Sequence, residues 1–171
     1  MGEEGLSSEE FLPLPLLKEL NIESCDRLLE IPQLPPSLET LRIDECQRLV
    51  ALPSNLRNLA KLRDVTVWNC SSLKALPDGM GGLTSLEELM IGGCPRIEEF
   101  PQGLLQRLPS LKYLEIWGCP GLLRLCREGG EYFDLVSSIP KTDIEVAEEL
   151  NQKQRKLERF LPFCSGDSPL R

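Results

Sequence analysis

The sequence of 171 residues contains no histidine. This absence excludes catalytic sites in which histidine activates a serine or a cysteine, and it excludes every zinc site with a histidine ligand. Positive charge is also scarce, because 19 lysines and arginines face 27 aspartates and glutamates, which leaves a net charge of -8. Binding to nucleic acid phosphates or to anionic lipids needs clustered positive charge. We therefore expect neither nucleic acid nor a membrane as a partner.

We expect no secretory signal peptide from this sequence, and it contains no apolar run close to the roughly 18 residues of a membrane-spanning helix. Its length suits one hydrophobic core rather than two. Cysteine, in contrast, is abundant, and its count of seven is odd. Without a secretory signal, extracellular disulfides are a poor explanation for these cysteines. Their spacing gives a better one.

Five of the cysteines close copies of one pattern, Leu-x-x-Leu-x-Ile-x-x-Cys, in which valine replaces the second leucine and the isoleucine in the third copy. The copies follow one another at intervals of 21, 24, 24 and 25 residues. Apolar residues follow each cysteine after three and six positions, and a proline comes next in the first four copies. This is the signature of leucine-rich repeats. The five cysteines are Cys25, Cys46, Cys70, Cys94 and Cys119.

The repeat predicts an α/β solenoid. The alternation in Leu-x-Ile is the period of a short strand, and stacked coils place these strands in a parallel sheet on a concave face. The proline-marked return segments are too short for long helices and predict an irregular convex side. We expect four parts: an N-terminal segment or partial repeat over residues 1–16, five leucine-rich repeats over 17–126, a C-terminal cap over 127–145, and a helical and then disordered tail over 146–171.

Two segments leave alternatives open. Within the cap, residues 139–144 are compatible with one last extended coil. In the tail, residues 146–160 are rich in Glu, Gln, Lys, Arg and Leu, which predicts a helix with a thin apolar stripe. A solvated helix leaning on the cap is the simpler interpretation, and a helix that binds a partner is the alternative.

The five repeat cysteines are predicted to be structural. Each lies where the chain turns inward after a strand, where it would serve as a small buried apolar residue whose S–H donates to backbone carbonyls. Metal binding or redox chemistry is the alternative. Zinc sites need closely spaced cysteine pairs that converge on one point, which a stacked column does not supply. Cys126 lies at the end of the last coil, and Cys164 lies in the polar tail.

Candidate partner-binding residues lie in the columns that face the concave surface. This face is acidic toward the first repeats and aromatic and apolar toward the last three. Both tryptophans fall in one column on either side of Gly92, so we expect two indoles roughly 10 Å apart that wall a slot floored by backbone. Exposed aromatic residues and methionine are typical of binding hot spots. The alternative is that the indoles only cover the sheet or a neighbouring domain. The candidates are Arg42, Thr66, Trp68, Glu88, Met90, Tyr113 and Trp117.

No catalytic constellation emerges, and we expect neither an enzyme nor a cofactor or metal site. Paired carboxylates of the glycosidase kind need a cleft and an apolar setting for one carboxyl group, which an open sheet does not offer. No glycine group is followed by the Lys-Ser or Lys-Thr pair of a phosphate-binding loop. Hydrolase activity remains a remote third option beside recognition and scaffolding.

With cysteine at the turn and an apolar-Pro step six residues later, the repeats resemble those of plant nucleotide-binding leucine-rich-repeat disease-resistance proteins of the coiled-coil class. The resemblance covers roughly residues 12–145. It is most specific at the end, where Cys119-Pro120, a second cysteine at 126, a Gly-Glu-aromatic step at 130–132 and Ile139-Pro140 follow one another. The family has a histidine at the position of Ser138.

The resemblance implies a cytoplasmic protein-recognition module that acts in the defence response. Its partner would be a pathogen effector, a guarded host protein or the upstream domains of a receptor. The sequence contains no nucleotide switch, so we expect a C-terminal part of a receptor, a truncated paralogue or a gene-model fragment. The alternative is a general leucine-rich-repeat scaffold or a ubiquitin-ligase substrate adaptor.

Overall fold

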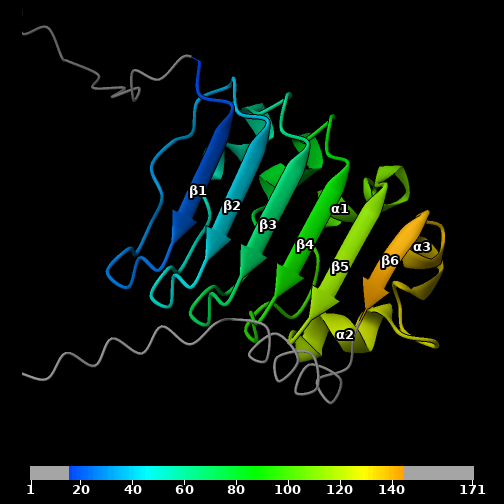
Figure 1. Cartoon of the computed structure of the whole chain (residues 1–171). Helices are drawn as coiled ribbons and strands as arrows, with labels where there is room; N and C mark the ends of the chain where they lie inside the picture. The colour runs from blue at the N-terminus through cyan, green and yellow to red at the C-terminus, as the bar shows by residue number, and fades with distance from the viewer. Residues whose placement is uncertain (1–15, 145–171) are drawn as a thin grey trace, which may run out of the picture.

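The computed structural model describes residues 16–144, which fold into an α/β arrangement with few helices. Six short strands form one sheet, lie side by side in chain order and all run parallel (Figure 1). This sheet is compatible with the predicted solenoid. The predicted tail over 146–171 and nearly all of the N-terminal segment over 1–16 lie outside the described residues. The strands are β1 (Glu19–Glu23), β2 (Thr40–Asp44), β3 (Asp64–Trp68), β4 (Glu88–Gly92), β5 (Tyr113–Trp117) and β6 (Lys141–Ile144).

The strands alternate between the core and the open side of the sheet. In β2, Leu41 and Ile43 are completely buried, whereas Arg42 between them is exposed. The register places Leu41 beside Leu20 of β1 and beside Val65 of β3. Equivalent residues of successive coils therefore stack in columns, and these columns form one continuous hydrophobic core.

A left-handed residue follows each of the first five strands. These residues have φ values of 53°, 54°, 51°, 60° and 58°, a conformation that glycine adopts most readily. The N–H of Asn69, for example, donates to the carbonyl of Gly92 on the next strand. This turn sends the next side chain, the cysteine of the repeat, toward the interior. The five residues are Ser24, Glu45, Asn69, Gly93 and Gly118.

The return segments lie behind the sheet and contain only short helical turns (Figure 1). Three of these helical turns begin directly after a proline, at positions 53, 77 and 101. The residue before a proline avoids the helical conformation, so the proline marks a boundary. Neighbouring return segments contact one another behind the strands. The helical turns are η1 (Ser54–Asn58), η2 (Asp78–Gly82), α1 (Gln102–Leu105) and η3 (Leu108–Ser110).

The fifth coil returns through a helix instead. Cys126 occupies the place where the earlier coils have proline, so nothing interrupts helix α2 (Pro120–Cys126), which Pro120 opens at its first position. Helix α3 (Phe133–Ser137) and strand β6 follow within the predicted cap. β6 occupies residues 141–144 of the segment 139–144, which was compatible with one last extended coil. Buried Tyr132 stacks on Phe100 with ring centroids 5.8 Å apart, which attaches the cap to the segment that follows β4.

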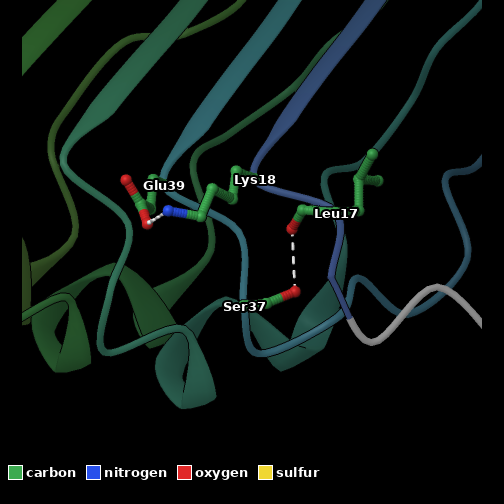
Figure 2. Close-up of polar contacts among 4 residues, drawn as sticks. All are labelled: Leu17, Lys18, Ser37 and Glu39. Atoms are coloured by element: carbon green, nitrogen blue, oxygen red, sulfur yellow. Dashed lines mark hydrogen bonds and ion pairs between the residues drawn. The ribbon is translucent and has the colours of Figure 1, made fainter.

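The positions just before the strands carry charges of alternating sign, which sequence analysis did not notice. These positions precede β1 to β5, and from β2 onward the N–H of each residue donates to the carbonyl of the one before it at 2.7–2.8 Å. Lys18 Nζ lies 3.0 Å from Glu39 Oε1, beside a bond from Ser37 Oγ to the Leu17 carbonyl (Figure 2), and Lys112 Nζ lies 2.8 Å from Glu87 Oε2. We call this column the charge ladder, and it consists of Lys18, Glu39, Arg63, Glu87 and Lys112.

Four of the five repeat cysteines are completely buried, namely those at 46, 70, 94 and 119. The thiol of Cys94 donates to the carbonyls of Gly92 at 3.3 Å and Val67 at 3.8 Å, so it links two neighbouring coils. Cys25 differs from the expectation of burial because it is exposed. It follows β1, which has a neighbouring strand on only one side within the described part of the chain.

Candidate protein-binding face

The outward side chains of the six strands form a surface that we call the open face. Its columns follow the register of the sheet, so that Arg42, Thr66 and Met90 lie in adjacent positions. Acidic residues extend over all six strands rather than only over the first repeats. The carboxylates on this face are Glu19, Glu23, Asp44, Asp64, Glu88, Glu115 and Asp143, and the cations are Arg42 and Lys141.

A hollow of about 230 Å³ lies on the open face over β1 to β4. Four of the predicted partner-binding residues line it, at positions 42, 66, 68 and 90. Asn21, Glu23 and Asp44 also line the hollow, although they were not among the predicted partner-binding residues. The complete lining is Asn21, Glu23, Arg42, Ile43, Asp44, Thr66, Trp68 and Met90.

Thr66 lies deeper than an exposed binding residue should. Only 4% of its surface is accessible, because this short side chain stands between Arg42 and Met90, which are both longer. Its hydroxyl oxygen has no hydrogen-bond partner among the described residues. Thr66 therefore forms part of the floor of the hollow rather than its rim.

The expected slot between the two tryptophans is absent from the described structure. The ring centroids of Trp68 and Trp117 are 6.3 Å apart with a tilt of 57°, a usual geometry for an aromatic pair. The indole of Trp117 leans over Gly92, so closely that a Cβ atom at that position would collide with it. The glycine that was predicted to floor a slot instead makes room for an indole that fills it.

Two residues that line the hollow have buried polar atoms without a hydrogen-bond partner among the described residues. Besides the Thr66 hydroxyl, the indole Nε1 of Trp68 is buried and has no hydrogen-bond acceptor among the described residues. Most buried polar groups in folded proteins are paired, and an unpaired one costs about 1–3 kcal/mol. Both atoms belong to residues that line the hollow.

The two carboxylates of the hollow differ in their surroundings. Asp44 accepts a hydrogen bond of 3.0 Å from Asn69 Nδ2, which holds the half-buried carboxylate in place. Glu23 on β1 is exposed. Arg42 lies between Asn21 and Thr66 in the register of the sheet and forms no ion pair within residues 16–144.

The remaining predicted residues lie outside the hollow. Tyr113 donates a hydrogen bond of 2.8 Å to Glu115, and the ammonium of Lys141 lies 4.7 Å from the centre of its ring. Burial and then the hydrogen bond to Glu115 raise the pKa of the Tyr113 hydroxyl above its usual range. Glu88 lies between Asp64 and Tyr113 in the first outward column. The structure therefore does not unite all seven candidates in one site.

The pKa is raised for four of the buried thiols, whereas a hydrogen bond with Cys94 lowers the pKa of the Cys119 thiol. Burial raises the pKa of Cys126 to about 12. A hydrogen bond with Cys119, followed by burial, raises the pKa of Cys94 to about 12. In the part of the chain that the structure describes, no cluster of three or more cysteines and acidic residues is arranged to hold a metal ion. None of the helices described there has the length and apolar character to cross a membrane.

No protein-family model matches the chain, and a search of the curated proteins finds no similar sequence. The resemblance to plant disease-resistance proteins therefore depends on the residue pattern alone.

Proposed function

We propose that the chain is a leucine-rich-repeat solenoid whose open face recognises a protein partner in plant defence. The partner would be a pathogen effector, a guarded host protein or the upstream domains of a receptor, and the site of action would be the cytoplasm. The sequence pattern supports the repeat assignment, since the five copies of the motif coincide with β1 to β5.

The observation that carries this proposal is the hollow on the open face. On a parallel sheet it combines an indole, a methionine side chain and two polar atoms that have no partner within residues 16–144. Such a combination is typical of binding hot spots, where apolar contact supplies affinity and a few polar groups supply specificity. The excess of carboxylates on the same face disfavours nucleic acid as the partner.

A pair of matched substitutions tests the proposal. Met90→Asp introduces a carboxylate into the hollow, and Val50→Asp introduces one at an apolar residue that is 37% exposed on a return segment. Proximity labelling in plant leaf cells would compare the neighbours of the wild type and of both variants. Calorimetry with the purified candidate partner would then measure the change in affinity, and circular dichroism would establish that both variants fold.

A protein that binds the wild type and Val50→Asp but binds Met90→Asp at least about tenfold more weakly would support the proposal. If every neighbour survives Met90→Asp, or if both variants lose the same neighbours, the open face is not the recognition surface. Ubiquitin-ligase subunits among the neighbours would favour the substrate-adaptor alternative.

A further inference from the structure

The walls of the hollow have the chemistry that attracts a cation. The carboxylates of Glu23 and Asp44 lie on one side, and the indole of Trp68 lies on the neighbouring strand in register with Asp44. Carboxylates attract a positive charge, and the face of an indole is the best aromatic surface for one. The wider open face has the same sign, since its carboxylates outnumber its cations.

The floor of the hollow offers hydrogen bonds to a polypeptide. The Thr66 hydroxyl can both donate and accept, and the Trp68 Nε1–H can donate. Neither has a partner among the described residues, although Thr66 is only 4% accessible and the Trp68 nitrogen is also buried. A cation alone would leave the indole N–H unpaired, because that group needs an acceptor. A backbone carbonyl beside the cationic side chain would satisfy it.

We propose that the hollow binds an arginine side chain within an extended segment of the partner protein. This inference rests on the proposed recognition function and specifies its chemistry. The planar guanidinium can stack on Trp68 while its N–H groups reach the carboxylates of Glu23 and Asp44. A lysine ammonium is a compact point charge, which cannot stack and point several donors in one plane.

Arg42 is the one cation in this lining, so its removal tests whether the ligand of the hollow is positively charged. Because it forms no ion pair in the described structure, its charge is free to repel an incoming guanidinium. Arg42→Gln removes this repulsion and should increase the affinity for arginine by about two- to fivefold. A decrease would contradict the proposed position of the guanidinium.

The experiment uses the two tryptophans of the chain as probes. In an ¹⁵N-labelled full-length protein they give two indole N–H signals, which Trp117→Phe assigns by removing one. The ligand titrated is N-acetyl-arginine N-methylamide, with the neutral citrulline analogue and the lysine analogue in parallel. We expect the arginine probe to shift the Trp68 signal with saturation, while citrulline leaves it in place and lysine binds more weakly.

Charge-neutralising variants localise the effect. Glu23→Gln combined with Asp44→Asn should weaken binding of the arginine probe by about five- to tenfold. The amide introduced at position 44 keeps an oxygen for the hydrogen bond from Asn69, so the turn is preserved. Glu98→Gln with Glu99→Gln removes the same charge on the return side, where both residues are exposed, and should leave the affinity unchanged.

Four results would overturn the inference. They are an absent shift of the Trp68 signal, equal shifts with citrulline, equal affinity for lysine, and equal weakening by the Glu98 and Glu99 control pair. These outcomes differ from failure of the proposed function, because a partner lost specifically on Met90→Asp would still establish the open face as the recognition surface.

Discussion

The first and fourth strands of the sheet have the same repeat motif in different surroundings. Leu20 and Ile22 of β1 are only partly buried, whereas Leu89 and Ile91 of β4 are completely inaccessible. Both strands pair in the same parallel register and end in the same left-handed turn. The motif therefore sets the local conformation, and the number of neighbouring coils sets how much a residue contributes to stability.

The largest expected effect is the difference in stability lost when the equivalent leucines of β4 and β1 are shortened to alanine. Leu89→Ala leaves a cavity between two neighbours and should lower the free energy of unfolding by about 2–5 kcal/mol. Leu20→Ala removes the same atoms from a partly exposed position and should cost about 1 kcal/mol or less. Urea unfolding followed by circular dichroism measures both. Equal losses would show that the first coil is as well packed as the fourth.

The second prediction concerns the aromatic pair, which β1 and β2 lack. Gly92→Ala places a Cβ atom where the Trp117 indole lies, so the indole must move away from Trp68. We expect a loss of about 1–3 kcal/mol and a changed tryptophan fluorescence spectrum. Glu88→Ala on the same strand is the control and should leave the spectrum as it is. An unchanged spectrum in Gly92→Ala would contradict the observed packing of the two indoles.

The third prediction compares a buried thiol with the exposed one. The pKa of Cys126 is about 12 in the folded protein, against about 8.5 for an unfolded thiol. As the pH rises above about 8.5, the unfolded state releases a proton that the folded state retains, so stability falls progressively toward pH 12.

Melting temperatures measured between about pH 8 and pH 11 test this pH dependence. Cys126→Ala should lose less stability over this range than the wild type does. Cys25→Ala, at the exposed cysteine of the first coil, should follow the wild type. A Cys126→Ala profile parallel to that of the wild type would show that this thiol does not contribute.

The smallest effect belongs to the charge ladder. Glu39→Gln removes the ion pair with Lys18, whose hydrogen bond lowers the pKa of the Glu39 carboxyl. The contribution of this ion pair to stability is present above the usual carboxyl pKa and disappears as the pH falls. It is small because both side chains are solvated and their attraction is screened by salt. At physiological salt we expect no resolvable change in melting temperature. A clear decrease would show that the ladder stabilises the first coil more than an exposed pair should.

The strand positions were predictable because the alternation of inward and outward residues is a property of the extended backbone. The motif places Leu41 and Ile43 inward, and it does so in every coil. Helix α2 was missed although its signal was visible. The missing proline at Cys126 allows the chain to continue as a helix, and only the departure from the repeat was noticed.

The candidate site was less predictable, because it depends on side-chain packing between strands. Trp68 and Trp117 were correctly paired in one column, but no local pattern determines that one indole leans over Gly92. The burial of Thr66 similarly depends on the longer side chains of both neighbours. Glu23 and Asp44 were in the right columns, and their nearness to Trp68 becomes significant only once the hollow is seen.

The charge ladder also limits which changes in the number of coils preserve its alternating charges. Along its rungs the signs alternate from Lys18 through Glu39, Arg63 and Glu87 to Lys112. Loss of a single internal coil, or duplication of any single coil, would place two like charges on neighbouring strands, which is unfavourable. Loss or duplication of two coils together would preserve the alternation. The charge pattern along the ladder therefore repeats every two strands, although the sequence motif repeats with every strand.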